Sequence, residues 1–269
     1  MSWTEAIILG LVQGLTEFLP VSSAGHLVLA RSVLETDIVY GLGFDAILHF
    51  ATALAVVWYF RSDLYVLGQT ALRKLGRLPV NRDDELLLYA IVIATIPGAA
   101  AGLLLESHIS GLFHSPLTVA GLLIAAAIFF MVAEYRQFTR PKITKLTYRS
   151  AFIIGLWQIV SLLPGVSRSG ITIGAGMLVG LSRHAAARFS FLIAIPITLG
   201  VGAKLTLDMI RTGESMVWGP VLVAAVVAFA SALVVIHYFL QFLRRYTLWP
   251  FIWYILILAV FIILAHFFS

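Results

Sequence analysis

The sequence predicts an all-α polytopic membrane protein with six transmembrane helices and two re-entrant helical hairpins. The first observation is composition: 61% of the 269 residues are hydrophobic and only 12% are charged, whereas soluble domains carry about 25% charged residues. The second is a set of apolar stretches, each near the roughly 20 residues that one membrane crossing needs. The third is that two of these stretches are interrupted by Pro, Gly and Ser. We therefore expect one membrane domain over residues 1–269.

Six apolar stretches run without interruption and are expected to cross the bilayer as helices. In chain order they are 38–60, 86–105, 117–133, 189–210, 217–240 and 249–268. Two further stretches, 6–30 and 151–181, are broken near their middles. Irregular backbone at membrane depth is tolerated where protein or a wet cavity covers it, so each broken stretch is expected to turn back as a hairpin. The alternative is an eight-helix bundle with proline kinks.

The two broken stretches resemble one another. Gly-Leu-x-Gln at 10–13 recurs at 155–158, and Val-Ser-x-x-Gly at 21–25 recurs at 166–170, both at an offset of 145. This predicts a duplication with halves of approximately 1–135 and 146–269. Duplicated membrane proteins commonly place the functional site where two broken segments meet, often with inverted topology.

The basic residues predict sidedness. If both broken stretches are hairpins, 14 of the 18 Lys and Arg residues fall on one side: Arg61, Arg73, Lys74, Arg77, Arg82, Arg136, Arg140, Lys142, Lys145, Arg149, Arg183, Arg188, Arg244 and Arg245. Since cytoplasmic loops retain Lys and Arg, this side is expected to be cytoplasmic, with both termini outside. The same rule explains the basic pI of 9.6 without nucleic-acid binding.

Ionisable groups at membrane depth are expensive and mark function by default. Glu17, His26 and Arg168 are such groups. Gln13 and Glu17 stand one helical turn apart on one face, and Ser23 follows closely after the break. Ser22, Ser167, Ser169 and Thr172 add hydroxyls around the two breaks, and with Gln13 and the Arg168 guanidinium they form a set suited to phosphate oxygens. Asp45, His49 and Gln158 are weaker candidates for a supporting layer.

At these residues the chain resembles the bacterial undecaprenyl-pyrophosphate phosphatase family. The family signatures Glu/Gln-x-x-x-Glu and Pro-Gly-x-Ser-Arg-Ser-x-x-Thr stand at 13–17 and 164–172. The resemblance implies hydrolysis of undecaprenyl diphosphate to the monophosphate in the bacterial plasma membrane, recycling of the lipid carrier of peptidoglycan synthesis, and bacitracin tolerance. The expected partners are that lipid and the bilayer, with a homodimer left open.

We expect a site that opens to the outer face, with Ser23 as the favoured nucleophile, His26 as its base and Arg168 on the phosphates. Glu17 is expected to orient His26, to handle a proton, or to hold a divalent cation such as Mg²⁺ or Ca²⁺ through substrate and water. Direct attack by water or by His26 stays open. The competing functions are a lipid flippase or other inverted-repeat transporter and an inert scaffold in which Glu17 and Arg168 form a structural ion pair.

Overall fold

The computed structural model describes residues 1–34, 41–109, 116–139, 146–163, 165–212 and 217–268. These residues form an all-helical bundle without strands. The helices are α1 (Trp3–Thr16), α2 (Ser23–Leu34), α3 (Gly41–Tyr59), α4 (Arg61–Leu75), α5 (Arg82–Ile109), α6 (Pro116–Thr139), α7 (Tyr148–Val160), α8 (Arg168–Leu178), α9 (Arg183–Thr212), α10 (Trp218–Arg245) and α11 (Trp249–Phe268). Pro164, Arg140, Lys142 and Lys145 lie outside the described residues.

In the described part of the chain, all six stretches expected to span the membrane are helical. Within the described residues, α5, α6, α9, α10 and α11 are long and apolar enough to cross a bilayer, and α3 with α4 supplies a sixth crossing if the pair is one span. Gly43–Tyr59 and Arg61–Leu75 are bent by 78° relative to each other. The sequence reasoning did not identify α4, whose exposed Arg and Lys residues interrupt the apolar pattern. The architecture is that of a polytopic membrane protein.

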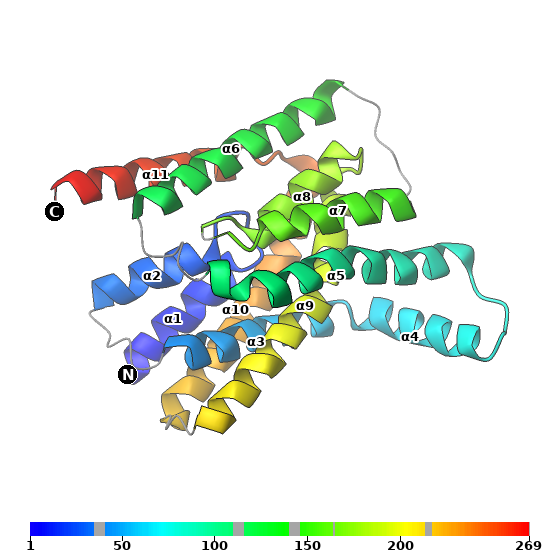
Figure 1. Cartoon of the computed structure of the whole chain (residues 1–269), viewed down its shortest axis with the longest axis horizontal. Coiled ribbons are helices and arrows are strands. Elements are labelled where there is room, and N and C mark those ends of the chain that lie inside the picture. Colours follow the sequence, from blue (N-terminus) through cyan, green and yellow to red (C-terminus); the bar gives the residue numbers. More distant parts are fainter. Residues whose placement is uncertain (35–40, 110–115, 140–145, 164, 213–216, 269) are drawn as a thin grey trace.

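The two broken stretches form two helical hairpins, α1–α2 and α7–α8. In Figure 1, α1 starts at the end of the molecule that holds both termini, and α2 returns toward that end. By contrast, α7 starts at the opposite end, and α8 returns toward that opposite end. Helix starts are fixed by side-chain caps: Ser2 and Glu5 form a capping box on α1, and the Ser167 hydroxyl accepts from the Gly170 amide at the start of α8. The turn before α2 places Ser22 at φ 71°.

Equivalent glycines seat the first arm of each hairpin. A Cβ on Gly10 of α1 would lie 2.4 Å from the Ala224 carbonyl oxygen of α10, and one on Gly155 of α7 would lie 2.6 Å from the Ala94 carbonyl oxygen of α5. Each arm thus packs against the backbone of a long helix from the other half of the chain. Only glycine permits so close an approach, which accounts for the glycine in both copies of the Gly-Leu-x-Gln motif.

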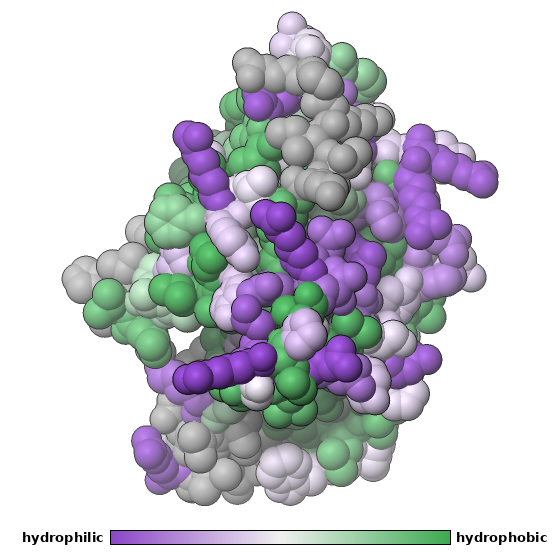
Figure 2. Space-filling view, turned by 90° about the vertical axis from the view of Figure 1, so that its right-hand side faces the viewer, coloured by the Kyte–Doolittle hydropathy of each residue, from purple (hydrophilic) through white to green (hydrophobic). Residues whose placement is uncertain are grey.

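Basic side chains gather at one end of the bundle. Figure 2 shows this end, where long hydrophilic side chains project from a largely hydrophobic body. The α4–α5 connection, the end of α6 and the start of α7 lie here in Figure 1. The α10–α11 turn lies here too, because the Leu248 amide donates to Glu134 near the end of α6 over 2.7 Å.

Glu134 joins three elements at this end and gives a stability prediction. The side chain is fully buried, its carboxylate accepts from Arg183 Nε at 2.9 Å, and it also accepts from the Leu248 amide. Glu134→Ala would leave a guanidinium and an amide without partners, which we expect to cost about 3–5 kcal/mol of stability. The thermal unfolding midpoint in detergent should fall clearly, while Glu5→Ala at the α1 cap should lower it much less. An unchanged midpoint for Glu134→Ala would contradict this account.

Candidate active site

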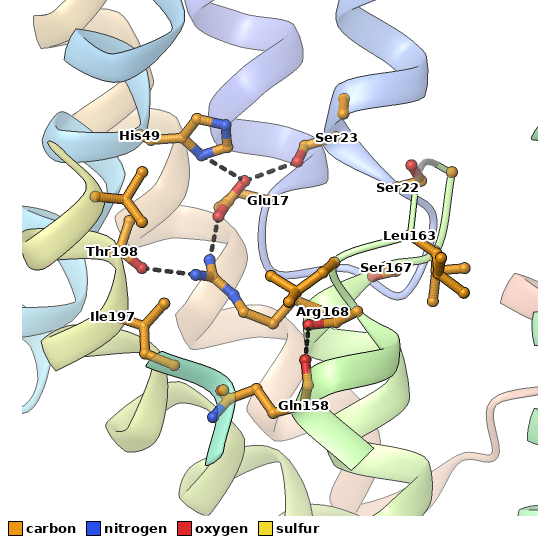
Figure 3. Close-up of a pocket in the computed structure, with 17 residues that line it drawn as sticks. Glu17, Ser22, Ser23, His49, Gln158, Leu163, Ser167, Arg168, Ile197 and Thr198 are labelled. Carbon is orange, nitrogen blue, oxygen red and sulfur yellow. Dashed lines mark hydrogen bonds and ion pairs between the residues drawn. The ribbon is translucent and has the colours of Figure 1, made fainter. Parts of the chain in front are cut away.

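Glu17 is the centre of a polar cluster where the two hairpins meet. It stands directly after α1, and its buried carboxylate accepts from Gln13 Nε2 at 2.9 Å and from Ser23 Oγ at 2.7 Å, both on Oε2. The other oxygen, Oε1, pairs with Arg168 Nη2 at 2.6 Å. His49 Nδ1 of α3 lies 3.2 Å from Oε2. Figure 3 shows Ser23, His49 and Arg168 converging on this carboxylate.

The planar guanidinium of Arg168 is fixed by hydrogen bonds to two partners. It is the first residue of α8, and its guanidinium donates to Glu17 through Nη2 and to Thr198 Oγ1 of α9 through Nη1 at 2.9 Å. Thr198 in turn donates to the Ala194 carbonyl over 2.7 Å, so its lone pairs face the arginine. The predicted meeting of Glu17 and Arg168 across the two hairpins is therefore present in the structure.

The cluster lines a cavity of about 230 Å³. Its polar lining includes Glu17, Ser23, His49 and Arg168, and its apolar lining includes Gly98, Leu162, Leu163, Ile197 and Val201. Sites for drug-sized ligands occupy about 300–1,000 Å³. The cavity therefore has room for a compact head group, and a long hydrocarbon chain would have to remain outside it.

Ser167 and Ser169 hold the hairpin tips together. Their hydroxyl oxygens lie 3.3 and 3.0 Å from the Leu19 carbonyl oxygen of the first hairpin, and 3.0 Å from each other. Ser167 and Ser22 line the cavity, whereas Ser169 does not. The second hairpin is thus fixed on the first, and this in turn fixes the guanidinium beside the carboxylate.

Thr172 also lies away from the cavity. Its hydroxyl is 2.6 Å from Ser190 Oγ of α9 and donates to the Arg168 carbonyl over 2.8 Å. Neither Ser169 nor Thr172 lines the cavity, so this arrangement does not support the phosphate contacts expected of them. Both side chains are buried on faces of α8 that pack against other protein elements, where they position the helix that carries Arg168.

His26 is not paired with Ser23 as expected. Its Nδ1 lies 2.8 Å from the Ser22 carbonyl oxygen, its Nε2 lies 2.5 Å from the Tyr254 hydroxyl of α11, and its ring stacks on that tyrosine. With both ring nitrogens so occupied, no nitrogen is available for the Ser23 hydroxyl, which donates to Glu17 instead. The carboxylate, rather than the imidazole, is placed to accept the serine proton.

The supporting residues divide into two groups. His49 and Gln158 line the cavity, and Gln158 Nε2 donates to the Ala94 carbonyl at 3.0 Å. Gln13 and Asp45 do not line it. Gln13 donates a hydrogen bond to the Glu17 carboxylate, and Asp45 forms an ion pair with Arg31 of α2. His49 is therefore closer to the chemistry than its sequence position indicated.

Comparison with known proteins decides the family. The family model "Bacitracin resistance protein BacA" matches residues 6–261. The chain belongs to the BacA family. Proteins named undecaprenyl-diphosphatase are 42% identical to it in Colwellia psychrerythraea, over 97% of both chains, 39% in Idiomarina loihiensis, over 99% of this chain and all of the relative, and 38% in Hahella chejuensis, over 96% of both.

Two residues of this BacA-family site were missed by the sequence reasoning. Thr198 is one hydroxyl in an apolar helix, and such a residue commonly bonds to the carbonyl four residues before it, so only the structure reveals its second role on Arg168. Tyr254 is an aromatic residue near a helix start, a position typical of an interfacial anchor. Neither residue carries a signal at the sequence level that connects it with the two hairpins.

Proposed function

We propose that this chain hydrolyses undecaprenyl diphosphate to undecaprenyl monophosphate and inorganic phosphate. The observation that carries the proposal is one cavity in which a serine hydroxyl bonded to a buried carboxylate faces a fixed guanidinium. Relatives over nearly the full length are named for this activity. The reaction would return the lipid carrier to peptidoglycan synthesis and confer bacitracin tolerance.

We also propose the membrane arrangement expected from the sequence. Six helices cross the bilayer, α1–α2 and α7–α8 enter from opposite sides without crossing, and halves 1–135 and 146–269 are related as an inverted repeat. The opposite directions of the hairpins and the paired glycines support this. With the basic end in the cytoplasm, both termini and the mouth of the first hairpin face outward.

The proposed first step is attack of Ser23 Oγ on the terminal phosphorus. The hydroxyl proton passes to Glu17 Oε2, 2.7 Å away, and from there to the undecaprenyl monophosphate that leaves as the bridging P–O bond breaks, so the carboxylate is ionised again. Water then attacks the phosphoserine and gives a proton to the carboxylate, which passes it to Ser23 Oγ as the serine–phosphate bond breaks and inorganic phosphate is freed. Arg168 stabilises the charge on the phosphoryl oxygens in both steps.

We propose that a divalent cation, if one takes part, is held mainly by the substrate and water and not by protein side chains. Within the described residues no group of three or more His, Cys, Asp and Glu side chains could hold a metal, and Glu17 is the one carboxylate among those that line the cavity. Both of its oxygens already face protein donors. These residues do not form a metal site on their own, so Mg²⁺ or Ca²⁺ would arrive mainly on diphosphate oxygens and water. Neither of the two proposed steps requires a cation.

His49 gives a prediction for the proton path. Its Nδ1 lies 3.2 Å from Glu17 Oε2 and 3.0 Å from Gln13 Nε2, so it can take a proton from the carboxylate or polarise it. We expect His49→Gln to lower kcat about tenfold or more, within the range for acid–base groups, with little change in KM. His237→Gln, on the exposed face of α10, is the matched control. Equal kcat values for the two variants would exclude His49 from the proton path.

The test of the function is phosphate release by the purified chain in detergent with undecaprenyl diphosphate as substrate. We expect one inorganic phosphate for each diphosphate consumed. A transporter would release none, and the same preparation in vesicles would then move the lipid between leaflets without changing it. That result would overturn the proposed function.

A further inference from the structure

A second cavity, which we call the basal groove, lies at the basic end of the bundle. It measures about 770 Å³ and is formed by the last turns of α10, the start of α11 and the tip of the first hairpin. None of the residues that line it takes part in the proposed catalytic cluster. Its volume falls within the range of about 300–1,000 Å³ that is typical of ligand sites.

The basal groove is polar at one end and apolar at the other. Leu19, Val235 and Phe239 line the deep end, whereas Arg244 and Arg245 line the opposite end. Val235 and Arg245 are ten residues apart on α10, so at 1.5 Å per residue the groove follows the helix for about 15 Å. That is about half of a hydrocarbon core roughly 30 Å thick, and therefore the depth of one leaflet.

The rim carries charge without a counter-charge from the protein. Arg244 and Arg245 are exposed and form no ion pair with a carboxylate of the described chain. Beside them the Tyr246 ring stacks on Phe242 with centroids 4.9 Å apart, and Tyr238 is 65% exposed. Exposed tyrosines are typical of the level of lipid head groups, and guanidinium groups bind phosphate oxygens through a planar fork.

We propose that the basal groove binds an anionic phospholipid of the surrounding leaflet. The phosphate lies on Arg244 and Arg245, and one acyl chain follows α10 down to Leu19. A soluble phosphate would use the rim alone and leave the apolar depth empty, so the length of the groove favours a lipid. Basic pockets between membrane helices bind such head groups elsewhere.

The deep end of the basal groove touches the element that builds the active site. Leu19 lines the groove, and its carbonyl oxygen accepts from the hydroxyls of Ser167 and Ser169. The acyl chain would thus support the hairpin tip from the side opposite the catalytic cavity. Binding of the phospholipid itself does not depend on the proposed hydrolysis.

The test is a titration of the full-length purified chain with dioleoyl phosphatidylglycerol in detergent, followed by native mass spectrometry. We expect the double variant Arg244→Gln/Arg245→Gln to bind the lipid roughly 30-fold more weakly, at about 1 kcal/mol for each basic residue near a membrane surface and 1.4 kcal/mol per tenfold. Arg73→Gln/Arg77→Gln removes the same charge from exposed positions at the same end, but neither residue lines the groove. Because the attraction falls off with distance from the charge, this variant should bind within about threefold of wild type. Phosphate release by each variant verifies folding.

Two further arms separate the alternatives. Dioleoyl phosphatidylcholine, with the same chains and no net charge, should bind distinctly more weakly than phosphatidylglycerol to wild type. Glycerol phosphate should not displace the lipid. Equal losses in the two double variants, equal binding of the two lipids, or displacement by glycerol phosphate would each overturn the proposal.

Discussion

Replacing Ser23 with alanine should lower kcat for phosphate release by about 10⁴-fold or more, the scale seen when a nucleophile is removed. The expectation rests on the 2.7 Å hydrogen bond from Ser23 Oγ to Glu17 and on the position of Ser23 in the cavity wall. The alanine variant keeps the buried Glu17–Arg168 pair, so the protein should fold and bind substrate. The measurement is inorganic phosphate released from undecaprenyl diphosphate.

Ser161 offers a matched control for this experiment. It also lines the cavity, but its hydroxyl donates to the Gln158 carbonyl over 2.6 Å and does not contact Glu17. Ser161→Ala should keep turnover within about threefold of wild type, as expected for a residue outside the reacting groups. If Ser23→Ala retained a similar rate, water rather than the serine would be the attacking group.

Arg168→Ala should lower kcat by about 10³-fold or more, because an arginine that stabilises a transferring phosphoryl group contributes 10³–10⁵ in rate. The change also leaves the buried Glu17 without its cationic partner. That carboxylate would then bind a proton more readily and accept the serine proton less well. Phosphate release at several pH values measures both effects.

Lysine at the same position separates charge from geometry. Arg168→Lys keeps one positive charge but cannot bond to Glu17 and Thr198 as a planar fork, so we expect it to restore only a small part of the lost rate. Arg188→Ala removes a more exposed arginine that pairs with Asp63 and should leave the rate near that of wild type. An Arg168→Ala enzyme as fast as Arg188→Ala would support the inert scaffold.

The sequence predicted most of the fold because its signals are local. Apolar length alone identifies the six long helices, and the Pro, Gly and Ser residues at the two breaks identify the hairpins. Helix α4 escaped prediction because its composition is mixed and its role depends on the 78° bend after α3. The direction in which each hairpin turns is a tertiary property, and only the charge pattern reported on it in advance.

Part of the polar cluster around Glu17 could also be predicted from the sequence, because the signals for it are local as well. Helical spacing correctly placed Gln13 and Glu17 on one face, and the cost of buried charge selected Glu17 and Arg168. Spacing along the chain could not show whether Ser23 would meet His26 or Glu17, because that depends on Tyr254 of α11 drawing the imidazole away. The importance of His49 likewise arises from how closely α3 approaches α1.

The central claim is that the phosphoryl group passes through Ser23 in the cavity between the hairpins. The most direct test is the stereochemical course at the terminal phosphorus, made chiral with sulfur and oxygen isotopes and hydrolysed in isotopically labelled water. Two successive in-line displacements, first by Ser23 and then by water, each invert the phosphorus, so the account predicts overall retention of configuration. Inversion would show a single direct attack by water and would contradict it.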